Sequence, residues 1–330
     1  MTTTAATSAI ATILRRAALR AMRAPSVHNT QPWTFTLGKN SLEIRADLGR
    51  QLSVLDPRGR QLIMSCGCAL FNARVAIAAA GYEPVVERYP DPAHPELVAR
   101  LTVGDARGWQ AIAALDLAID QRRTNRRAFA PEPVPPSVVG DLVQAARAEG
   151  AILVPITSVE HRLATARLSK LADQIEHADP AYRDELRAWT TDDPRRRDGV
   201  QAASVPYAGT GAASDDPLPI REFDVRGMGW LPSSSHSDVD QCLLLLCSIQ
   251  DSAPSWLRAG EALEHLWLEL TRQGYWATPL AQVVEVGATH EELRAELDLD
   301  VHPEILLRVG RAPDTVRTQR RHPMDIIFEP

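Results

Sequence analysis

Apolar residues recur at helical spacing in two separate stretches, one starting at Gly67 and the other at Gly260. The first set is Leu70, Ala73, Ile77 and Ala80, and the second is Leu263, Leu266 and Leu270. Each stretch reaches a Gly-Tyr pair, Gly81-Tyr82 or Gly274-Tyr275, fourteen residues after its first glycine. Glycine is typical of the position just past a helix end. The pattern therefore predicts two related helices that begin at the first glycine and end before the second.

Related strands are predicted after both helices, over residues 96–101 (Glu-Leu-Val-Ala-Arg-Leu) and 304–309 (Glu-Ile-Leu-Leu-Arg-Val). Upstream, residues 18–24 are similar in sequence to residues 142–148, and both segments lead to a predicted strand. Self-similarity at long period indicates a duplicated unit. Chance likeness of two amphipathic helices is the alternative, and the matched glycine spacing argues against it.

We therefore expect an α+β fold in which residues 1–330 form a single unit of two duplicated halves. The N-terminal half covers about residues 8–104 and the C-terminal half about residues 120–330, with its repeated part at 137–310. An arginine-rich segment and the proline-rich stretch 131–136 join them.

A polar loop follows the first predicted helix, which covers about Ser8 to Arg23. The loop runs from Pro25 to Trp33 (Pro-Ser-Val-His-Asn-Thr-Gln-Pro-Trp) and leads into a predicted strand at residues 34–37. Its prolines restrict the backbone, so the helix cannot continue through it. Polar loops held between regular elements often carry binding residues. Taken alone, this loop predicts contact with a planar or anionic ligand.

Arginines gather in two other segments, residues 121–129 (Gln-Arg-Arg-Thr-Asn-Arg-Arg-Ala-Phe) and residues 317–321 (Arg-Thr-Gln-Arg-Arg). Guanidinium groups match phosphate oxygens well. The alternative is a solvated surface helix whose arginines pair with Asp116 and Asp120. The Thr124-Asn125 pair argues against that alternative, because both residues favour a helix start over a helix interior. A helix that begins here would aim N–H groups at an anion.

Together the three segments resemble the flavin-binding elements of the FMN-dependent nitroreductase family, and more narrowly its duplicated, single-chain Acg-type branch. The resemblance covers most of the chain except about residues 177–232. It implies FMN as cofactor, with the loop against the isoalloxazine ring and the arginines around the phosphate and ribityl chain. The implied contacts are Pro25, Ser26, Val27, His28, Asn29, Thr30, Gln31, Arg122, Arg123, Thr124, Arg126, Arg317, Arg320 and Arg321.

The resemblance also implies individual roles. Arg126 occupies the place of the family's cation at the N1–O2 edge of the ring, and Gln31 supports the loop. No catalytic side chain is expected, because the flavin carries out the redox step. An imidazole such as His28 titrates near neutral pH and could donate a proton, but we expect His28 to act as a loop contact.

Family homodimers share two sites between two chains, so a duplicated chain implies an intramolecular pseudo-dimer and a monomer. Nothing near residues 150–155 reproduces the polar loop. The mirror-related site is therefore expected to be inactive, leaving one FMN per chain.

The stretch of about residues 177–232 is rich in Gly, Pro and Asp, which disfavour long regular elements. We predict a lid over the flavin, with Trp189, Tyr207, Met228 and Trp230 as covering residues; a surface excursion is the alternative.

Two functions follow: an NAD(P)H-dependent oxidoreductase with ping-pong transfer through FMN, or an FMN-sequestering protein whose lid blocks substrates. A third option, a scaffold that has lost FMN, is disfavoured because all three segments are present.

Charge, apolar runs and cysteine spacing bear on further classes of protein and binding site. The net charge of −6 gives no basic domain for nucleic acid. No signal peptide or membrane-spanning run is apparent, since the apolar run Leu243 to Leu246 with Cys242 and Cys247 is far too short, so we expect a cytoplasmic protein. The four cysteines form no disulfide framework, and the pairs Cys66/Cys68 and Cys242/Cys247 match no common zinc pattern. Buried structural thiols and no bound metal are expected.

Overall fold

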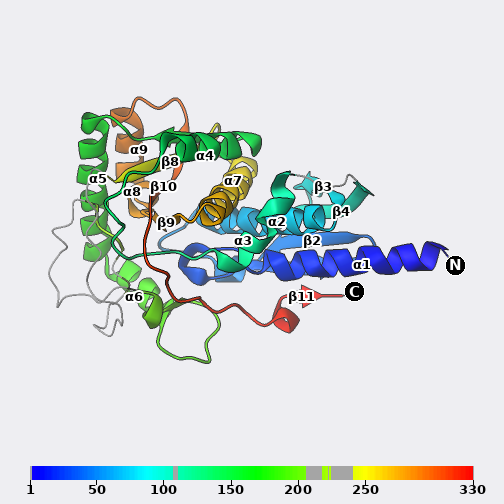
Figure 1. Ribbon diagram of the computed structural model, residues 1–330. Coiled ribbons are helices and arrows are strands. Elements are labelled where there is room, and N and C mark those ends of the chain that lie inside the picture. Colours follow the sequence, from blue (N-terminus) through cyan, green and yellow to red (C-terminus); the bar gives the residue numbers. More distant parts are fainter. Residues whose placement is uncertain (1, 107–110, 206–217, 222, 224–240, 330) are drawn as a thin grey trace.

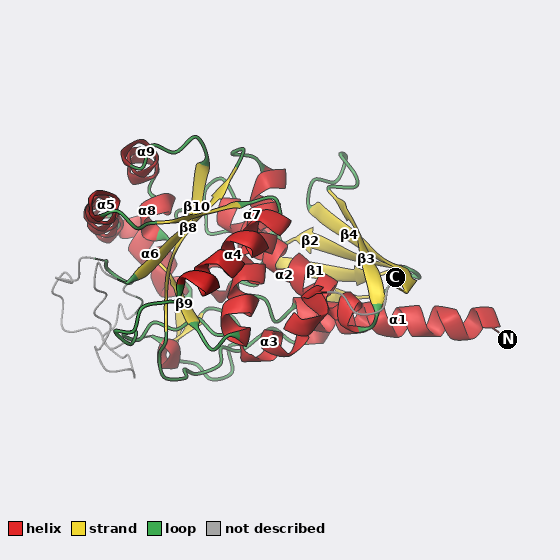
Figure 2. Ribbon diagram, turned by 45° about the horizontal axis from the view of Figure 1, so that its top comes forward, coloured by secondary structure: helices red, strands yellow, loops and turns green. Residues whose placement is uncertain are grey.

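Two sheets lie on either side of a central pair of helices in the computed structural model of the chain (Figures 1 and 2). The structure describes residues 2–106, 111–205, 218–221, 223 and 241–329. The central helices are α2 (Arg60–Ala79) and α7 (Ala253–Arg272), which pack against each other along their length. The architecture is α+β, as the sequence predicts.

The N-terminal half forms one sheet and the C-terminal half the other. The first half contains, in chain order, α1 (Thr2–Ala21), β1 (Trp33–Leu37), β2 (Ser41–Ala46), α2, β3 (Tyr82–Arg88) and β4 (Leu97–Ala106). The second contains α4 (Pro136–Ala148), β5 (Ile152–Pro155), β8 (Cys242–Ser248), α7, β9 (Trp276–Pro279) and β10 (His302–Gly310).

The strand order is the same in both sheets. It is β1-β2-β4-β3 in the first and β5-β8-β10-β9 in the second, with antiparallel neighbours throughout these runs. The residues that the sequence aligned therefore occupy equivalent elements. This topology supports the predicted duplication, which stays a prediction.

The central helices approach most closely at the two glycines that the sequence pattern matched. A Cβ atom on Gly67 would lie 2.1 Å from the carbonyl oxygen of Leu257, and one on Gly260 would lie 2.0 Å from that of Met64. Only a residue without a side chain permits this backbone contact. The prediction that the helices begin at these glycines is wrong. Both begin seven residues earlier, because the glycines mark a helix crossing and not a helix start.

Helix α2 has the length and apolar composition of a membrane span, and among the described helices it alone does. Most of its apolar window is buried between α1, α7 and the first sheet. The apolar run 243–246 is the buried middle of β8, which lies between β5 and β10. Both features are therefore explained by the core of this fold.

The C-terminal segment crosses from the second half back to the first. After β10 the chain runs along the molecule and adds β11 (Ile327–Phe328) beside β1, where Phe35 pairs with Ile327 in parallel (Figure 1). Residues 317–321 thereby reach the loop that follows α1. This crossing brings the distant basic segment to the polar loop.

An insertion separates β5 from β8. Its described part contains α5 (Val159–Ala178), α6 (Pro180–Ala188) and two short paired strands, β6 (Thr190–Thr191) and β7 (Val200–Gln201). Helix α6 has nine residues and is compatible with the expectation that long regular elements are disfavoured here. Asp179 caps this helix by accepting from the N–H of Ala181, and Pro180 fits its first turn. Helices α8 (Gln282–Glu285) and α9 (Gly287–Glu296) form a second insertion, between β9 and β10.

Candidate functional site

A continuous series of cavities runs between the two halves. An apolar cavity of about 770 Å³, open mouth included, adjoins a smaller one, and both are lined by Pro25, Ser26, His28, Thr124 and Arg126. The smaller one shares Arg122, Arg123, Thr318 and Arg320 with a third. We call the smaller cavity and the third one together the arginine cavity. The three predicted segments therefore meet at one cleft.

Side chains of several elements line the apolar cavity. Both central helices and the second sheet form its walls. Its apolar lining includes Met64 of α2, Leu263 and Trp267 of α7, Pro279 of β9 and Ile305 of β10. Such walls suit a flat, largely apolar ring.

The polar loop after α1 has an unusual backbone. His28, Asn29 and Gln31 have φ of 45°, 54° and 50°, a left-handed conformation that non-glycine residues rarely adopt. Three side-chain hydrogen bonds hold it in this shape. The hydroxyl of Ser26 accepts from the N–H of Gln31 (2.9 Å), the hydroxyl of Ser65 accepts from the N–H of Val27 (3.2 Å), and Arg50 donates to the carbonyl of Thr30 (2.8 Å). Strain of this kind is maintained at ligand sites.

His28 is buried at the junction of the cavities. Its Nε2 accepts a hydrogen bond from Arg221 (2.7 Å), and a guanidinium can only donate. Burial and the charges of Arg221 and Arg126 lower the pKa of His28 well below its usual value. The ring is therefore neutral and carries its proton on Nδ1. It does not supply a proton as an imidazolium, in line with its expected role as a loop contact.

Arg126 is a buried cation that lines both the apolar cavity and the arginine cavity. Its guanidinium lies 4.7 Å from the ring centre of Phe223 and donates to the carbonyl of Ser204 (3.3 Å). Burial and repulsion by Arg221 lower its pKa to about 10. No described carboxylate forms an ion pair with it.

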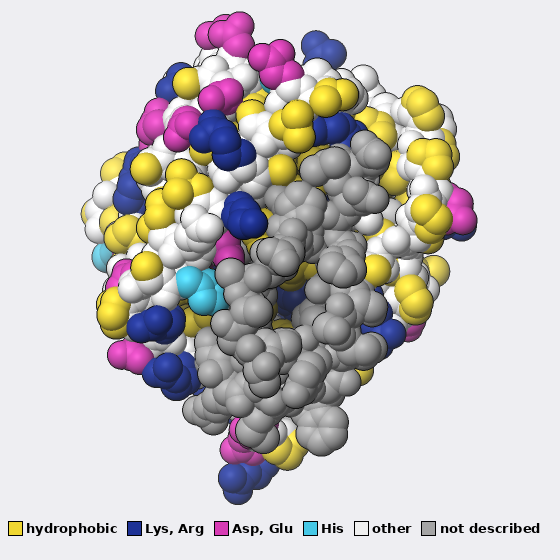
Figure 3. Space-filling view, turned by 90° about the vertical axis from the view of Figure 1, so that its left-hand side faces the viewer, with side chains coloured by type: hydrophobic (Ala, Val, Ile, Leu, Met, Phe, Trp, Pro, Cys, Tyr) yellow, Lys and Arg dark blue, Asp and Glu magenta, His cyan; other side chains and the backbone are white. Residues whose placement is uncertain are grey.

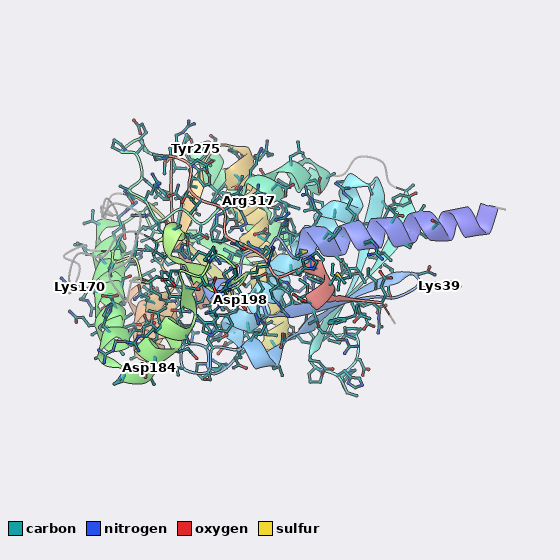
Figure 4. The ribbon with its side chains drawn as sticks, turned by 90° about the horizontal axis from the view of Figure 1, so that it is seen from below. Lys39, Lys170, Asp184, Asp198, Tyr275 and Arg317 are labelled. Atoms are coloured by element: carbon teal, nitrogen blue, oxygen red, sulfur yellow. The ribbon has the colours of Figure 1, made fainter. Side chains whose placement is uncertain are left out.

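The arginine cavity concentrates positive charge. One of its two spaces is lined by five arginines and, among the described residues, one carboxylate, Asp120, which pairs with Arg20 of α1. The arginines are Arg23, Arg122, Arg123, Arg317 and Arg320 (Arg317 is labelled in Figure 4). Burial and the neighbouring arginines lower the pKa of Arg320 to about 9 and that of Arg123 to a smaller extent. An anion here would relieve this repulsion.

Segment 122–130 is not a helix, and the predicted helix start is wrong. Helix α3 (Asp116–Gln121) ends just before it. Asn125 holds the segment instead: its backbone N–H donates to Ala277 of β9 (3.2 Å) and its side chain donates to Pro313 (2.8 Å). The surface-helix alternative fails too, since Asp116 and Asp120 pair with arginines of α1. Extended backbone lets Arg122, Thr124 and Arg126 reach the cleft.

Three predicted contacts lie away from the cleft. Thr30 and Gln31 are fully buried and line none of its cavities. Gln31 instead binds the loop to the C-terminal segment, accepting from the N–H of Arg321 (2.7 Å). Arg321 lines only an outer groove and donates to the carbonyls of Gln31 and Trp33, because its side chain points toward Asp47. These residues shape the site and do not line it.

The remaining predicted contacts line the cleft. They are Pro25, Ser26, Val27, His28, Asn29, Arg122, Arg123, Thr124, Arg126, Arg317 and Arg320.

The insertion contributes residues that the sequence reasoning missed. Ile220, Arg221 and Phe223 line the apolar cavity. Arg221 forms ion pairs with Glu285 of α8 and with Glu176 of α5, at 3.6 Å from the latter. No local sequence signal marks these residues, since their approach depends on the path of the insertion.

The four residues predicted to cover the flavin fall into two groups. Trp189 does not line the apolar cavity; it packs between Arg50 and Arg196, each 5.5 Å from its ring centre. Tyr207, Met228 and Trp230 lie outside the described residues.

Buried glutamates on α7 were also missed. Glu261 and Glu264 have no exposed surface. Their position on the apolar stripe between Gly260 and Trp267 is a signal that could have identified them, because carboxylates on a buried helix face need partners.

The described residues contain no group of three or more His, Cys, Asp or Glu side chains arranged to hold a metal ion. All four cysteines are free, and burial raises the pKa of Cys242 to about 11 and that of Cys247 to about 12. On the face in Figure 3, described acidic and basic side chains lie side by side among apolar ones.

Comparison with individual known proteins, and not with family models, identifies the family. No family model matches the sequence. The chain is 35% identical over 294 residues to the Mycobacterium tuberculosis protein "Putative NAD(P)H nitroreductase Rv3131", covering 89% of this chain and 83% of the relative. It is 30% identical over 325 residues to "Putative NAD(P)H nitroreductase acg" of the same organism, covering 96% and 95%. The chain belongs to the nitroreductase family, and the predicted family and fold class are confirmed.

Two solved nitroreductases overlay on part of this chain. One is the FMN-dependent nitroreductase NfnB from Mycobacterium smegmatis in complex with NADPH, with 18% identity, a TM-score of 0.41, and coverage of 66% of this chain and 97% of that one. Another is a nitroreductase with bound FMN from Desulfitobacterium hafniense, with 12% identity, a TM-score of 0.39, and coverage of 65% and 97%.

Proposed function

We propose that the chain is an FMN-dependent oxidoreductase that uses NAD(P)H. The observation that carries the proposal is the arginine cavity, where clustered guanidinium groups with few carboxylates adjoin a large apolar space. An elongated ligand with a flat ring at one end and a phosphate at the other matches this distribution. FMN has that form, and named relatives and solved structures of the family include NAD(P)H- and FMN-dependent proteins.

The residues present fit FMN in two respects. Arg122, Arg123 and Arg320 supply charged donors for a phosphate, and the buried Nε atoms of Arg122 and Arg320 have no hydrogen-bond partner among the described residues. Thr124 and Thr318 line the space between the phosphate end and the apolar cavity. Bound FMN would supply hydride transfer from NAD(P)H to an acceptor such as a nitroaromatic or a quinone.

The protein's own contribution is electrostatic and steric. Arg126, buried and without a described carboxylate partner, can stabilise negative charge that develops on a ring in the apolar cavity. The neutral His28 and its strained loop fix one wall, and the apolar side chains exclude water.

One cofactor per chain is part of the proposal. Counting from the matched glycines, Trp267 and Cys68 of the apolar cavity correspond to Arg74 and Glu261. Arg74 and Glu261 form an ion pair (2.8 Å), and Glu149 pairs with Arg74 and His265. This ionic network fills the mirror-related position, which argues against a second site.

The proposal is tested with purified protein and FMN in the absence of oxygen. After addition of NADPH, we expect loss of the flavin absorption band and then its return when a nitroaromatic or quinone is added. Failure to bind FMN would refute the proposal.

Sequestration of FMN is the second candidate, and Ile220, Arg221 and Phe223 favour it, because the insertion places them in the wall of the apolar cavity, where they take up space beside a bound ring. A flavin-loaded protein that dithionite reduces but NADPH does not would support this alternative.

A further inference from the structure

Glu264 of α7 is a fully buried carboxyl directly behind the arginine cavity. Its Oε1 lies 3.6 Å from Nε of Arg122, a distance at which the charges interact without a hydrogen bond. Neither of its oxygens has a hydrogen-bond partner among the described residues. Burial makes an ionised carboxylate costly in this position, and the nearby guanidinium of Arg122 offsets part of that cost.

The groups around Glu264 come from three other parts of the chain. Arg122, after α3, lies against the ring of Trp267 at 5.1 Å, and Arg320 of the C-terminal segment is close enough to act on the carboxyl. Cys68 and Asn72 face it from α2. Asn72 is fully buried, and its amide oxygen and nitrogen also lack hydrogen-bond partners. A protonated Glu264 could donate to that amide oxygen, and an ionised one could accept from the amide nitrogen, so Asn72 can serve both protonation states.

The site therefore holds one internal carboxyl that competes with any external anion for the same guanidinium groups. When the cavity is free of anions, ionised Glu264 offsets part of the charge of Arg122 and Arg320. When a phosphate engages these arginines, a second negative charge close behind them becomes unfavourable.

We propose that Glu264 is a proton-linked counter-ion of the phosphate site, so that binding of the cofactor phosphate is accompanied by uptake of one proton at this carboxyl. The proposal rests on the assignment of the arginine cavity to the FMN phosphate. The proton comes from the solvent, and no bond of the cofactor changes.

The direction of the pH dependence follows from linkage. Burial raises the pKa of Glu264 to about 7, against the opposing effect of Arg122. A bound phosphate would raise the pKa of this carboxyl further, so the complex favours the protonated form. FMN affinity is then greatest below pH 7. It falls about tenfold per pH unit above 7, until the pKa of the complex is passed.

Isothermal titration calorimetry of the intact protein with FMN tests this. Titrations at pH 7.5 in HEPES and in Tris give the number of protons exchanged, from the different ionisation enthalpies of the buffers. For the wild-type protein we expect net uptake of a substantial fraction of one proton, and a Kd that rises between pH 7 and 8.5. The second ionisation of the FMN phosphate, with a pKa of ~6, is nearly complete in this range, so the phosphate itself does not account for the proton uptake.

Glu264→Gln removes the titrating group and keeps the shape of the side chain. We expect this variant to bind FMN without the additional proton uptake, with a flatter pH profile and an affinity at pH 8.5 above that of the wild type. Glu269→Gln is the matched control, since Glu269 lies on the same helix and pairs with Arg272. It should keep the wild-type profile.

The outcomes separate this inference from the proposed function. Absence of FMN binding by the wild type refutes the proposed function. FMN binding without proton uptake refutes the role of Glu264 alone, and so does a Glu264→Gln variant that binds more weakly at every pH, because that result indicates a purely positioning role. The wild-type proton count decides the matter even if the variant does not fold.

Discussion

At the scale of single residues, adjacent side chains in the basic C-terminal segment have different tasks. Arg320 lines the arginine cavity and donates to Thr318 Oγ1 (2.7 Å) and Asn29 Oδ1 (3.2 Å). Arg321 points the other way, toward backbone carbonyls and Asp47. The sequence shows two equivalent arginines, and only the path of the backbone distinguishes them.

Arg320→Ala is predicted to weaken FMN binding by about 10- to 100-fold, because charge-assisted hydrogen bonds contribute ~1.5–3 kcal/mol each. Arg321→Ala is predicted to lower the melting temperature with a smaller loss of affinity. Flavin fluorescence titrations and thermal unfolding measure the two effects. Equal losses of affinity in the two variants would contradict the assignment.

A second prediction at this scale concerns acid stability. Burial acts to raise the pKa of Glu149, but His265 and Arg74 outweigh it and bring that pKa down to about 2. The folded state gains stability from this group above the ordinary glutamate pKa of ~4.3, and loses it as the pH falls toward 2. Glu149→Gln should lower the free energy of unfolding at pH 7 by about 3 kcal/mol.

The difference between wild type and Glu149→Gln should shrink as the pH drops through 4 to 3, which urea unfolding at these pH values would reveal. A constant difference across that range would show that the effect of the substitution is not electrostatic.

At the scale of elements, the contact between α2 and α7 determines how the two halves fit together. Gly67 and Gly260 let the backbones touch, and the cavity walls contributed by Met64 and Trp267 depend on that spacing. Larger residues at the crossing would separate the helices and displace both walls.

Gly67→Ala and Gly260→Ala are each predicted to lower the free energy of unfolding by about 3 kcal/mol, because the new Cβ meets backbone atoms that cannot rotate away. Gly140→Ala on α4 is the control. A Cβ there meets nothing within 4 Å, so helix propensity should stabilise the protein by up to ~1 kcal/mol. Denaturant unfolding of the three variants gives the comparison, and a mild effect at the crossing would disprove the close contact.

At the scale of the whole molecule, the cleft belongs to neither half. The loop comes from the first half, Arg122 to Arg126 from the connection, and Arg317 and Arg320 from the segment that returns from β10 to β1. In the proposed duplication, the ionic network around Arg74 and Glu149 fills the position that mirrors this cleft.

We therefore predict one FMN per chain and a monomeric chain. Titration of the protein with FMN, followed by the flavin absorption, should saturate at one equivalent, and sedimentation velocity should give the mass of one chain, 36.2 kDa. Saturation at two equivalents would contradict the argument from the ionic network.

Local sequence was sufficient for much of this protein. The polar loop follows from its prolines and the strands from runs of apolar residues, since both depend on interactions between residues close in the chain. The clusters of basic and polar residues are also local features, but the fourteen individual contacts came from the resemblance to the family, and eleven of them line the cleft.

Tertiary structure alone decided the rest. Side chains such as Arg321 and Gln31 turned away from the cleft because partners about 290 positions distant hold them there. Arg221, Glu264 and the ionic network at Arg74 acquired their environments from segments far apart in the chain. Burial and charge pairing depend on which segments meet, and the sequence pattern of one segment carries no record of its neighbours in space.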